Sequence, residues 1–288
     1  MALAATVTCV AGALASCSGG SGTAHPPAPT PGDTAIGGTA GQGGRSIWML
    51  TRGALAQVAA DPTVRARLLG SPIYQLLQPG QAPMPWTGSV PVVTFGSAAE
   101  MDHAVTGGNL PPGTKALLYD PEVWSFTPVG EQHNPAAAAR AAKAVAQAHG
   151  LQLISAPALN LTGVLGGHGG PRWRQFLDLG IIAQMARTSN VIELQAQSLE
   201  RNAVVYEKFV RAAAAQARRA NPRVTVLAGL STNPPGPLVT SQHLAAVIRA
   251  TWHVVDGYWL NIPGRGPRCP KCNAPNPEVG RAALRAVL

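Results

Sequence analysis

The chain has 288 residues, of which 46% are hydrophobic, and a formal net charge of +9 at pH 7. A chain of this length and apolar content can bury a large core, and it fits one α/β domain better than two small ones. Its basic residues are scattered singly or in pairs, with no basic run that alternates with aromatic residues. This scatter argues against nucleic acid as a partner, whereas attraction to an anionic envelope or polysaccharide stays open.

The first 16 residues are small and apolar and contain no acidic or basic side chain. They end in Leu14-Ala15-Ser16-Cys17, which resembles the lipobox of bacterial lipoproteins, where the leader is cut off before the cysteine and the thiol carries diacylglycerol. The resemblance implies a signal peptide at residues 1–16, lipidation of Cys17 and a place on the outer face of the cell membrane. An ordinary secretory signal is the alternative, and it too exports the protein.

Residues 17–44 are mostly Gly, Ser, Thr, Pro and Ala, and we expect a disordered tether there. No other stretch reaches the roughly 18 to 20 apolar residues that span a bilayer, so the lipid is the only expected membrane contact. The remaining residues, 45–288, are predicted to form a single domain. Its only cysteines are Cys269 and Cys272, for which we expect a local disulfide; half of a zinc site and a redox motif are the alternatives.

Seven strands are expected at residues 46–51, 90–95, 115–120, 151–156, 191–197, 224–230 and 256–262. Helices are expected at residues 52–69, 97–105, 135–149, 171–188, 198–220, 241–250 and 277–288. This alternation predicts a parallel sheet with right-handed crossovers. Seven units favour a TIM-like (β/α) barrel that is either one strand short or has an eighth strand hidden in an irregular segment, and a doubly wound parallel sheet is the alternative. No Gly-x-Gly-x-x-Gly turn follows the first strand, and we predict no cofactor and no metal site.

Several of these strands end in polar or acidic residues, at the edge where α/β proteins build their sites. Period-two alternation places Asp120 and Glu122 on one side of the third strand, and Glu193 and Gln195 on one side of the fifth. If both faces point inward, the carboxylates meet across the barrel. Paired carboxylates suit glycoside hydrolysis, in which one acid protonates the leaving oxygen and the other activates water or attacks. Capping of a turn by Asp120 and Glu122, or an ion pair of Glu193 with Arg52, is the structural alternative.

Further side chains near these strand ends are predicted to bind the substrate: Arg52, Trp124, Asn160, Gln195, Gln197, Asn233, Trp259 and Asn261. Amides would hold sugar hydroxyls, and indoles would stack on sugar rings. Turn formation by the asparagines and core packing by the tryptophans are the alternatives.

Residues 119–124 (Tyr-Asp-Pro-Glu-Val-Trp) and 191–195 (Val-Ile-Glu-Leu-Gln) together resemble TIM-barrel glycoside hydrolases. With Gly-Tyr-Trp-Leu-Asn at 257–261, the chain also looks like secreted lipoproteins of actinobacteria. The Asp-x-x-Asp-x-Asp-x-Glu motif of the chitinase-like family is not present. The resemblance implies a monomeric, membrane-tethered hydrolase that acts on an extracellular or cell-wall glycan through Glu122 and Glu193.

Two other functions stay open. One is a non-catalytic lipoprotein that binds a sugar or peptide at the same place. The other is an enzyme that acts on an anionic or phosphorylated substrate through Arg265 and Arg268, because Gly with Arg after the last strand suits an anion.

Overall fold

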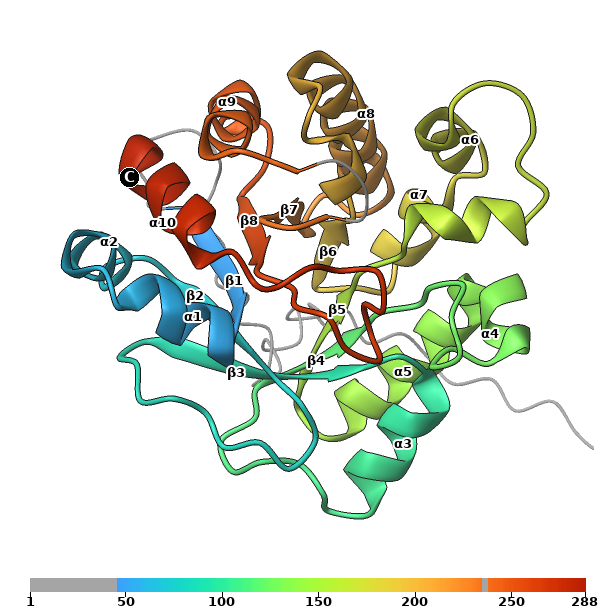
Figure 1. Ribbon diagram of the computed structural model, residues 1–288. Helices are drawn as coiled ribbons and strands as arrows, with labels where there is room; N and C mark the ends of the chain where they lie inside the picture. Colours follow the sequence, from blue (N-terminus) through green and yellow to red (C-terminus); the bar gives the residue numbers. More distant parts are fainter. Residues whose placement is uncertain (1–45, 235–237) are drawn as a thin grey trace, which may run out of the picture. The chain divides into compact units, whose positions relative to one another are not determined.

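The computed structural model describes residues 46–234 and 238–288. Within these residues, eight parallel strands pair in chain order and close into a barrel (Figure 1). The strands are β1 (Ile47–Thr51), β2 (Ile73–Leu77), β3 (Ser89–Phe95), β4 (Ala116–Tyr119), β5 (Gln152–Ser155), β6 (Val191–Leu194), β7 (Thr225–Ser231) and β8 (Gly257–Asn261). The predicted (β/α) barrel is confirmed, and the doubly wound sheet was wrong because β8 pairs with β1.

The eighth strand is β2, which the sequence analysis did not identify. The predicted helix at residues 52–69 is two helices, α1 (Arg52–Ala59) and α2 (Pro62–Leu68). Asp61 caps the second helix by accepting hydrogen bonds from the backbone N–H groups of Thr63 and Val64, and a proline follows it at the first helical position. This cap restarts the helix, and the five buried residues that follow its end complete the barrel.

A ring of helices covers the outer face of the strands (Figure 1). Beyond α1 and α2 they are α3 (Ala98–Thr106), α4 (Val129–His133), α5 (Pro135–Ala148), α6 (Arg172–Asp178), α7 (Ile181–Ala186), α8 (Ala203–Ala220), α9 (Ser241–Thr251) and α10 (Pro277–Val287), with 3-10 turns η1 (Leu159–Gly163) and η2 (Gln197–Leu199). The predicted helix at 171–188 breaks at Gly180, whose φ of 65° is left-handed. None of the helices in the described residues is long and apolar enough to cross a membrane.

The inward-facing side chains of the strands fill the barrel in layers. Because each strand is staggered against its neighbour, inward residues from alternate strands lie at one height. Following the register upward, one layer is Met49, Val92, Ile154 and Leu227; the next is Leu76, Leu118, Glu193 and Trp259; above it lie Thr51, Thr94, Ala156 and Gly229. Asp120, Gln195 and Asn261 follow at the rim. The lumen therefore changes from apolar to polar toward the carboxyl ends of the strands.

The loop between β8 and α10, residues 263–276, contains the disulfide between Cys269 and Cys272, as predicted. In Figure 1 this red segment passes in front of the strands, and its Arg268 lies over two aromatic rings of the loop that follows β4. The loop therefore reaches over the carboxyl end of the barrel. The predicted signal peptide, Cys17 and the tether lie outside the described residues.

Candidate active site

Asp120 stands at the rim of the lumen, directly after β4. Its Oδ1 accepts a hydrogen bond of 2.7 Å from Nε2 of Gln195, which also donates to the carbonyl of Ala156 at 2.8 Å. Three neighbouring strand ends are thereby tied together around one carboxyl group. Burial, and secondarily the nearby charge of Glu122, raise the pKa of Asp120 well above its ordinary value, against the lowering influence of Arg268 and Gln195.

Glu122 lies in the loop after β4, and Thr127 holds this loop in place. The Thr127 hydroxyl donates to the carbonyl of Gly96 at 2.7 Å, and it accepts from the Trp124 indole at 2.7 Å and from the Glu122 backbone N–H at 3.2 Å. A Cβ at Gly96 would stand 2.8 Å from Cβ of Phe126, so glycine is what permits this approach. The backbone that carries Glu122 is therefore fixed.

The environment of Glu122 is mixed, since its side chain is only partly buried. The pKa of Glu122 is raised, chiefly by burial, although hydrogen bonds from Gln195 and Asn160 and the charge of Arg268 oppose the rise. Asn160 in turn accepts a hydrogen bond from the backbone N–H of Val123 at 3.0 Å. Glu122 thus has partners that stabilise its ionised form.

Glu193 differs from both, because its side chain is 0% exposed and neither oxygen has a hydrogen-bond partner in the described part of the chain. The alternative of an ion pair with Arg52 was wrong: Arg52 is exposed at the start of α1, and no ion pair joins the two among the described residues. Burial, followed by the charges of Asp120 and Glu122, raises the pKa of Glu193 well above its ordinary value. Its burial thus favours the protonated form.

Gly229 of β7 makes room for the Glu193 carboxyl. A Cβ at this position would lie 2.5 Å from Oε1 of Glu193 and 2.5 Å from Nε2 of Gln197. The carbonyl of Gly229 accepts a hydrogen bond of 3.1 Å from the hydroxyl of Tyr206 on α8, which anchors the strand from outside. The predicted ligand Gln197 is thus brought beside Glu193.

Arg268 is a member of this site that the sequence analysis assigned to anion binding instead. Its guanidinium lies 5.6 Å from the ring centroid of Trp124 and 5.2 Å from that of Phe126, which are cation–π distances. Its charge lowers the pKa of Asp120 and of Glu122, but it does not contribute to that of Glu193. No sequence signal placed Arg268 here, since its position depends on the path of the 263–276 loop.

The remaining predicted ligands are divided between the lumen and its loops. Asn233 donates its amide hydrogens to the carbonyls of Pro263 and Ala274 at 3.3 and 3.2 Å, so it holds the base of the 263–276 loop. This is the turn role that the sequence left open. Trp259 lies in the lumen, and Asn261 ends β8 at the rim. Among the described residues, no group of three or more His, Cys, Asp or Glu side chains is arranged to hold a metal ion.

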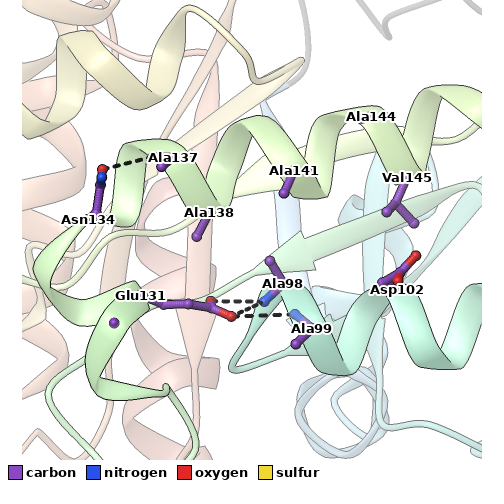
Figure 2. Close-up of a pocket in the computed structure, with 11 residues that line it drawn as sticks. Ala98, Ala99, Asp102, Glu131, Asn134, Ala137, Ala138, Ala141, Ala144 and Val145 are labelled. Atoms are coloured by element: carbon purple, nitrogen blue, oxygen red, sulfur yellow. Dashed lines mark hydrogen bonds between the residues drawn. The ribbon is translucent and has the colours of Figure 1, made fainter. Parts of the chain in front are cut away.

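A second feature lies away from the lumen: a groove of about 650 Å³ between α3 and α5, lined largely by alanines (Figure 2). The carboxylate of Glu131 in its wall accepts hydrogen bonds from the backbone N–H groups of Ala98 and Ala99, the closest at 2.9 Å, and from the Tyr119 hydroxyl at 2.9 Å. Glu131 therefore caps α3. We assign no chemistry to this groove, because its glutamate is occupied by the fold.

Comparison with known proteins supplies no function. No family model matches the sequence, and a search of curated proteins finds no match. Similar solved structures include a chitinase from Chromobacterium violaceum (TM-score 0.43, 11% identity, covering 84% of this chain and 98% of that one). A curdlan-specific exo-β-1,3-glucanase from Blastomyces gilchristii (0.44, 13%, 83% and 97%) and a Schiff-base-forming fructose-1,6-bisphosphate aldolase (0.43, 17%, 85% and 95%) are others. Glycoside hydrolases and an aldolase share this architecture, so the likeness does not select an activity.

Proposed function

We propose that this chain is an exported, membrane-tethered enzyme of the glycoside hydrolase type, which cleaves an extracellular or cell-wall glycan by acid–base chemistry between carboxyl groups. One observation carries the proposal: carboxyl groups at one end of the barrel lie in opposite environments. Glu122 has hydrogen bonds and a nearby cation, while Glu193 has neither within the described chain. A hydrogen-bonded carboxyl beside a buried, unpaired one is the kind of pair that acid–base cleavage of a glycosidic bond uses.

In this proposal the protonated Glu193 donates its proton to the glycosidic oxygen as the bond to the leaving sugar breaks. The ionised Glu122 attacks the sugar carbon or activates a water molecule. Asp120 contributes through the hydrogen bond that orients Gln195. In this proposal Gln195, Gln197, Asn160 and Asn261 hold sugar hydroxyls, and the Trp124 ring stacks on a sugar.

The anionic-substrate alternative receives less support than the glycan. Arg268 lies near two carboxyl groups, whose charges oppose an anion, and the Arg265 Nε donates to the carbonyl of Cys272 at 3.3 Å. A non-catalytic sugar-binding protein would bind its ligand at the same carboxyl end of the barrel, and it differs from the enzyme only in that no bond is cut. Activity measurements therefore separate the two.

The test is product release from a panel of soluble and cell-wall polysaccharides by the purified protein, its Glu122→Gln and Glu193→Gln variants, and Glu207→Gln as a control. Glu207 is an exposed acid that pairs with Arg211 on α8. We expect each site variant to lose about 10²- to 10⁴-fold in rate and the control to keep full activity. Thermal stabilisation by a glycan without product release would favour the binding protein and contradict catalysis.

Export and tethering are a separate part of the proposal, supported by the Leu14-Ala15-Ser16-Cys17 sequence alone. We expect cells that express the chain to incorporate labelled palmitate into it, and a Cys17→Ser variant to lose the label. Labelling that persists in Cys17→Ser would contradict the assignment of the lipid to this thiol.

A further inference from the structure

The carboxyl groups of the candidate site are covered by the protein itself. Asp120 and Glu193 are only 5% and 0% exposed, and the Gln197 side chain fills the space beside Gly229. A carboxyl group with almost no exposed surface cannot touch a glycan, so the proposed chemistry requires a part of the protein that moves aside. The 263–276 loop, which passes over the carboxyl end of the barrel (Figure 1), is in the position to do so.

This loop is held in shape by contacts of its own. The backbone N–H of Arg265 donates to the carbonyl of Asn273 at 3.2 Å, and the backbone N–H of Cys269 donates to the carbonyl of Gly266 at 2.9 Å. The disulfide between Cys269 and Cys272 adds a covalent link within the same segment. A loop that is cross-linked in this way keeps its conformation when it moves as a whole.

Both ends of the loop are held by one side chain, Asn233. Its amide donates to the carbonyls of Pro263 and Ala274 at 3.3 and 3.2 Å. Asn233 is itself fixed, because its backbone N–H donates to the Ser231 hydroxyl at 3.2 Å, and the Ser231 N–H donates to the buried Glu200 carboxyl at 2.9 Å. The two ends of the loop therefore meet at a point that is anchored to β7, and this point can serve as a pivot.

Arg268 attaches the loop at a second point, on the segment that follows β4. Its guanidinium lies 5.6 Å and 5.2 Å from the ring centroids of Trp124 and Phe126, which contact each other edge to face. Its charge also acts on Asp120 and Glu122. A cation–π contact changes an equilibrium by about threefold to thirtyfold. Such a contact is weak enough to be broken and remade each time a substrate enters.

We infer that the 263–276 loop is a lid that turns as one body about Asn233, and that Arg268 latches it shut on the two aromatic rings of the segment after β4. The inference rests on the proposed function for the reason to open, since the Trp124 ring is proposed to stack on a sugar. A sugar that stacks on the face under Arg268 displaces the guanidinium and releases the latch. Opening then uncovers the rim of the lumen, and Asp120 with it.

The first test is labelling of carboxyl groups in the full chain by a carbodiimide and an amine, read by mass spectrometry. Arg268→Ala removes the latch, so the labelling rates of Asp120 and Glu122 should rise about threefold to thirtyfold. Phe126→Leu removes one of the two rings and should give a smaller rise. Lys271→Ala changes an exposed residue of the same loop and should label as the wild type does. Unchanged labelling in Arg268→Ala, or an equal rise in Lys271→Ala, would refute the latch.

The second test uses backbone hydrogen exchange to ask whether the loop moves as one body. The amides of Arg265 and Cys269 donate within the loop, so in Arg268→Ala they should exchange as slowly as in the wild type. Faster exchange of these amides would mean that the loop unravels, and it would overturn the lid. Neither measurement uses a glycan. A lid that opens in a protein without hydrolytic activity would therefore stand while the proposed hydrolase fails, and hydrolysis without a change in labelling would remove the lid alone.

Discussion

The groove between α3 and α5 and the lumen of the barrel each contain a glutamate, and the two carboxyls differ completely in their partners. Glu131 in the groove accepts hydrogen bonds from two backbone N–H groups and a tyrosine hydroxyl (Figure 2). Glu193 in the lumen accepts none from the described residues. The fold therefore satisfies the carboxyl oxygens of Glu131 with hydrogen bonds and leaves those of Glu193 without partners among the described residues.

This difference shows that open volume and chemical capacity are separate properties. The groove has about 650 Å³, but its lining is mostly alanine on α5 and the start of α3, where small side chains simply fail to fill the gap between two helices. The lumen is nearly closed but carries unpaired polar atoms. An unpaired buried carboxyl lowers the stability of the fold. Its presence in the lumen therefore points to a functional role there, which the groove does not require.

The largest difference between the two glutamates is expected when each is exchanged for glutamine and the rate of hydrolysis is measured. Glu193→Gln should reduce hydrolysis of the responsive polysaccharide about 10²- to 10⁴-fold, because an amide cannot donate the proton that the leaving oxygen needs. Glu131→Gln should retain the rate of the wild type. Rates are measured at saturating polysaccharide on samples with matching circular dichroism spectra. Equal losses of rate in both variants would remove the distinction between the two acids.

Stability should respond in the opposite direction. Glu131→Gln removes the charge at the start of α3 and weakens the hydrogen bond from Tyr119, so we expect the free energy of unfolding to fall by about 1–3 kcal/mol. Glu193→Gln breaks no hydrogen bond among the described residues and should be as stable as the wild type or more so. Urea titrations of the two variants at pH 7 measure both free energies of unfolding and test this reversed order.

A smaller effect is expected from Gly229→Ala, which sharpens the claim that the lumen is built around Glu193. The new methyl group would stand 2.5 Å from Oε1 of Glu193 and from Nε2 of Gln197, so one of the two must shift. Overpacking of this kind costs about 1–3 kcal/mol. Gly53→Ala in α1 is the control, since nothing lies within 4 Å of its added Cβ. Urea titration of both variants measures the difference, and equal stability would contradict the close fit.

The barrel itself could be predicted from the alternation of strands and helices, because parallel strands covered by helices give long apolar runs. The strand β2 was missed for a local reason. It follows a short helix restarted by Asp61, and the pattern of residues 52–69 is compatible with one uninterrupted helix. The break at Gly180 was missed in the same way, since one glycine in an apolar helical pattern does not by itself indicate a stop.

Part of the site was equally predictable. Period-two alternation placed Asp120 and Glu193 on inward faces, and the hydrogen bond between Gln195 and Asp120 agrees with that placement. The role of Arg268 was not, because loop paths are not encoded in periodicity. The suggested pairing of Arg52 with Glu193 failed because a residue that begins a helix outside the barrel cannot reach its lumen.

A further prediction concerns stability against pH, and it tests whether Glu193 is protonated in the folded state. Its pKa is raised on folding, so in the range between the unfolded value near 4.5 and the higher folded value the native state binds more protons than the unfolded state. Stability contributed by this group is therefore present at low pH and is lost as pH rises through that range. Glu193→Gln should show a flatter decline than the wild type in urea titrations between pH 5 and 8. Parallel declines would mean that Glu193 is ionised in the native protein.

The smallest expected effect comes from Arg268, whose charge acts differently on Glu122 and on Glu193. Arg268 lowers the pKa of Asp120 and Glu122 but not that of Glu193, so Arg268→Gln should raise the pKa of the proposed base and leave the proposed acid alone. In the pH profile of kcat/KM the acidic limb then moves to higher pH, because the base is ionised only above its pKa. The basic limb of the profile stays in place. Arg268→Lys should move the limb less, since the charge remains. Arg265→Gln, an exposed arginine on the same loop, is the control for loop disturbance. A shift of both limbs, or the same shift in Arg265→Gln, would show that the loop as a whole, and not the Arg268 charge, sets the environment of Glu122.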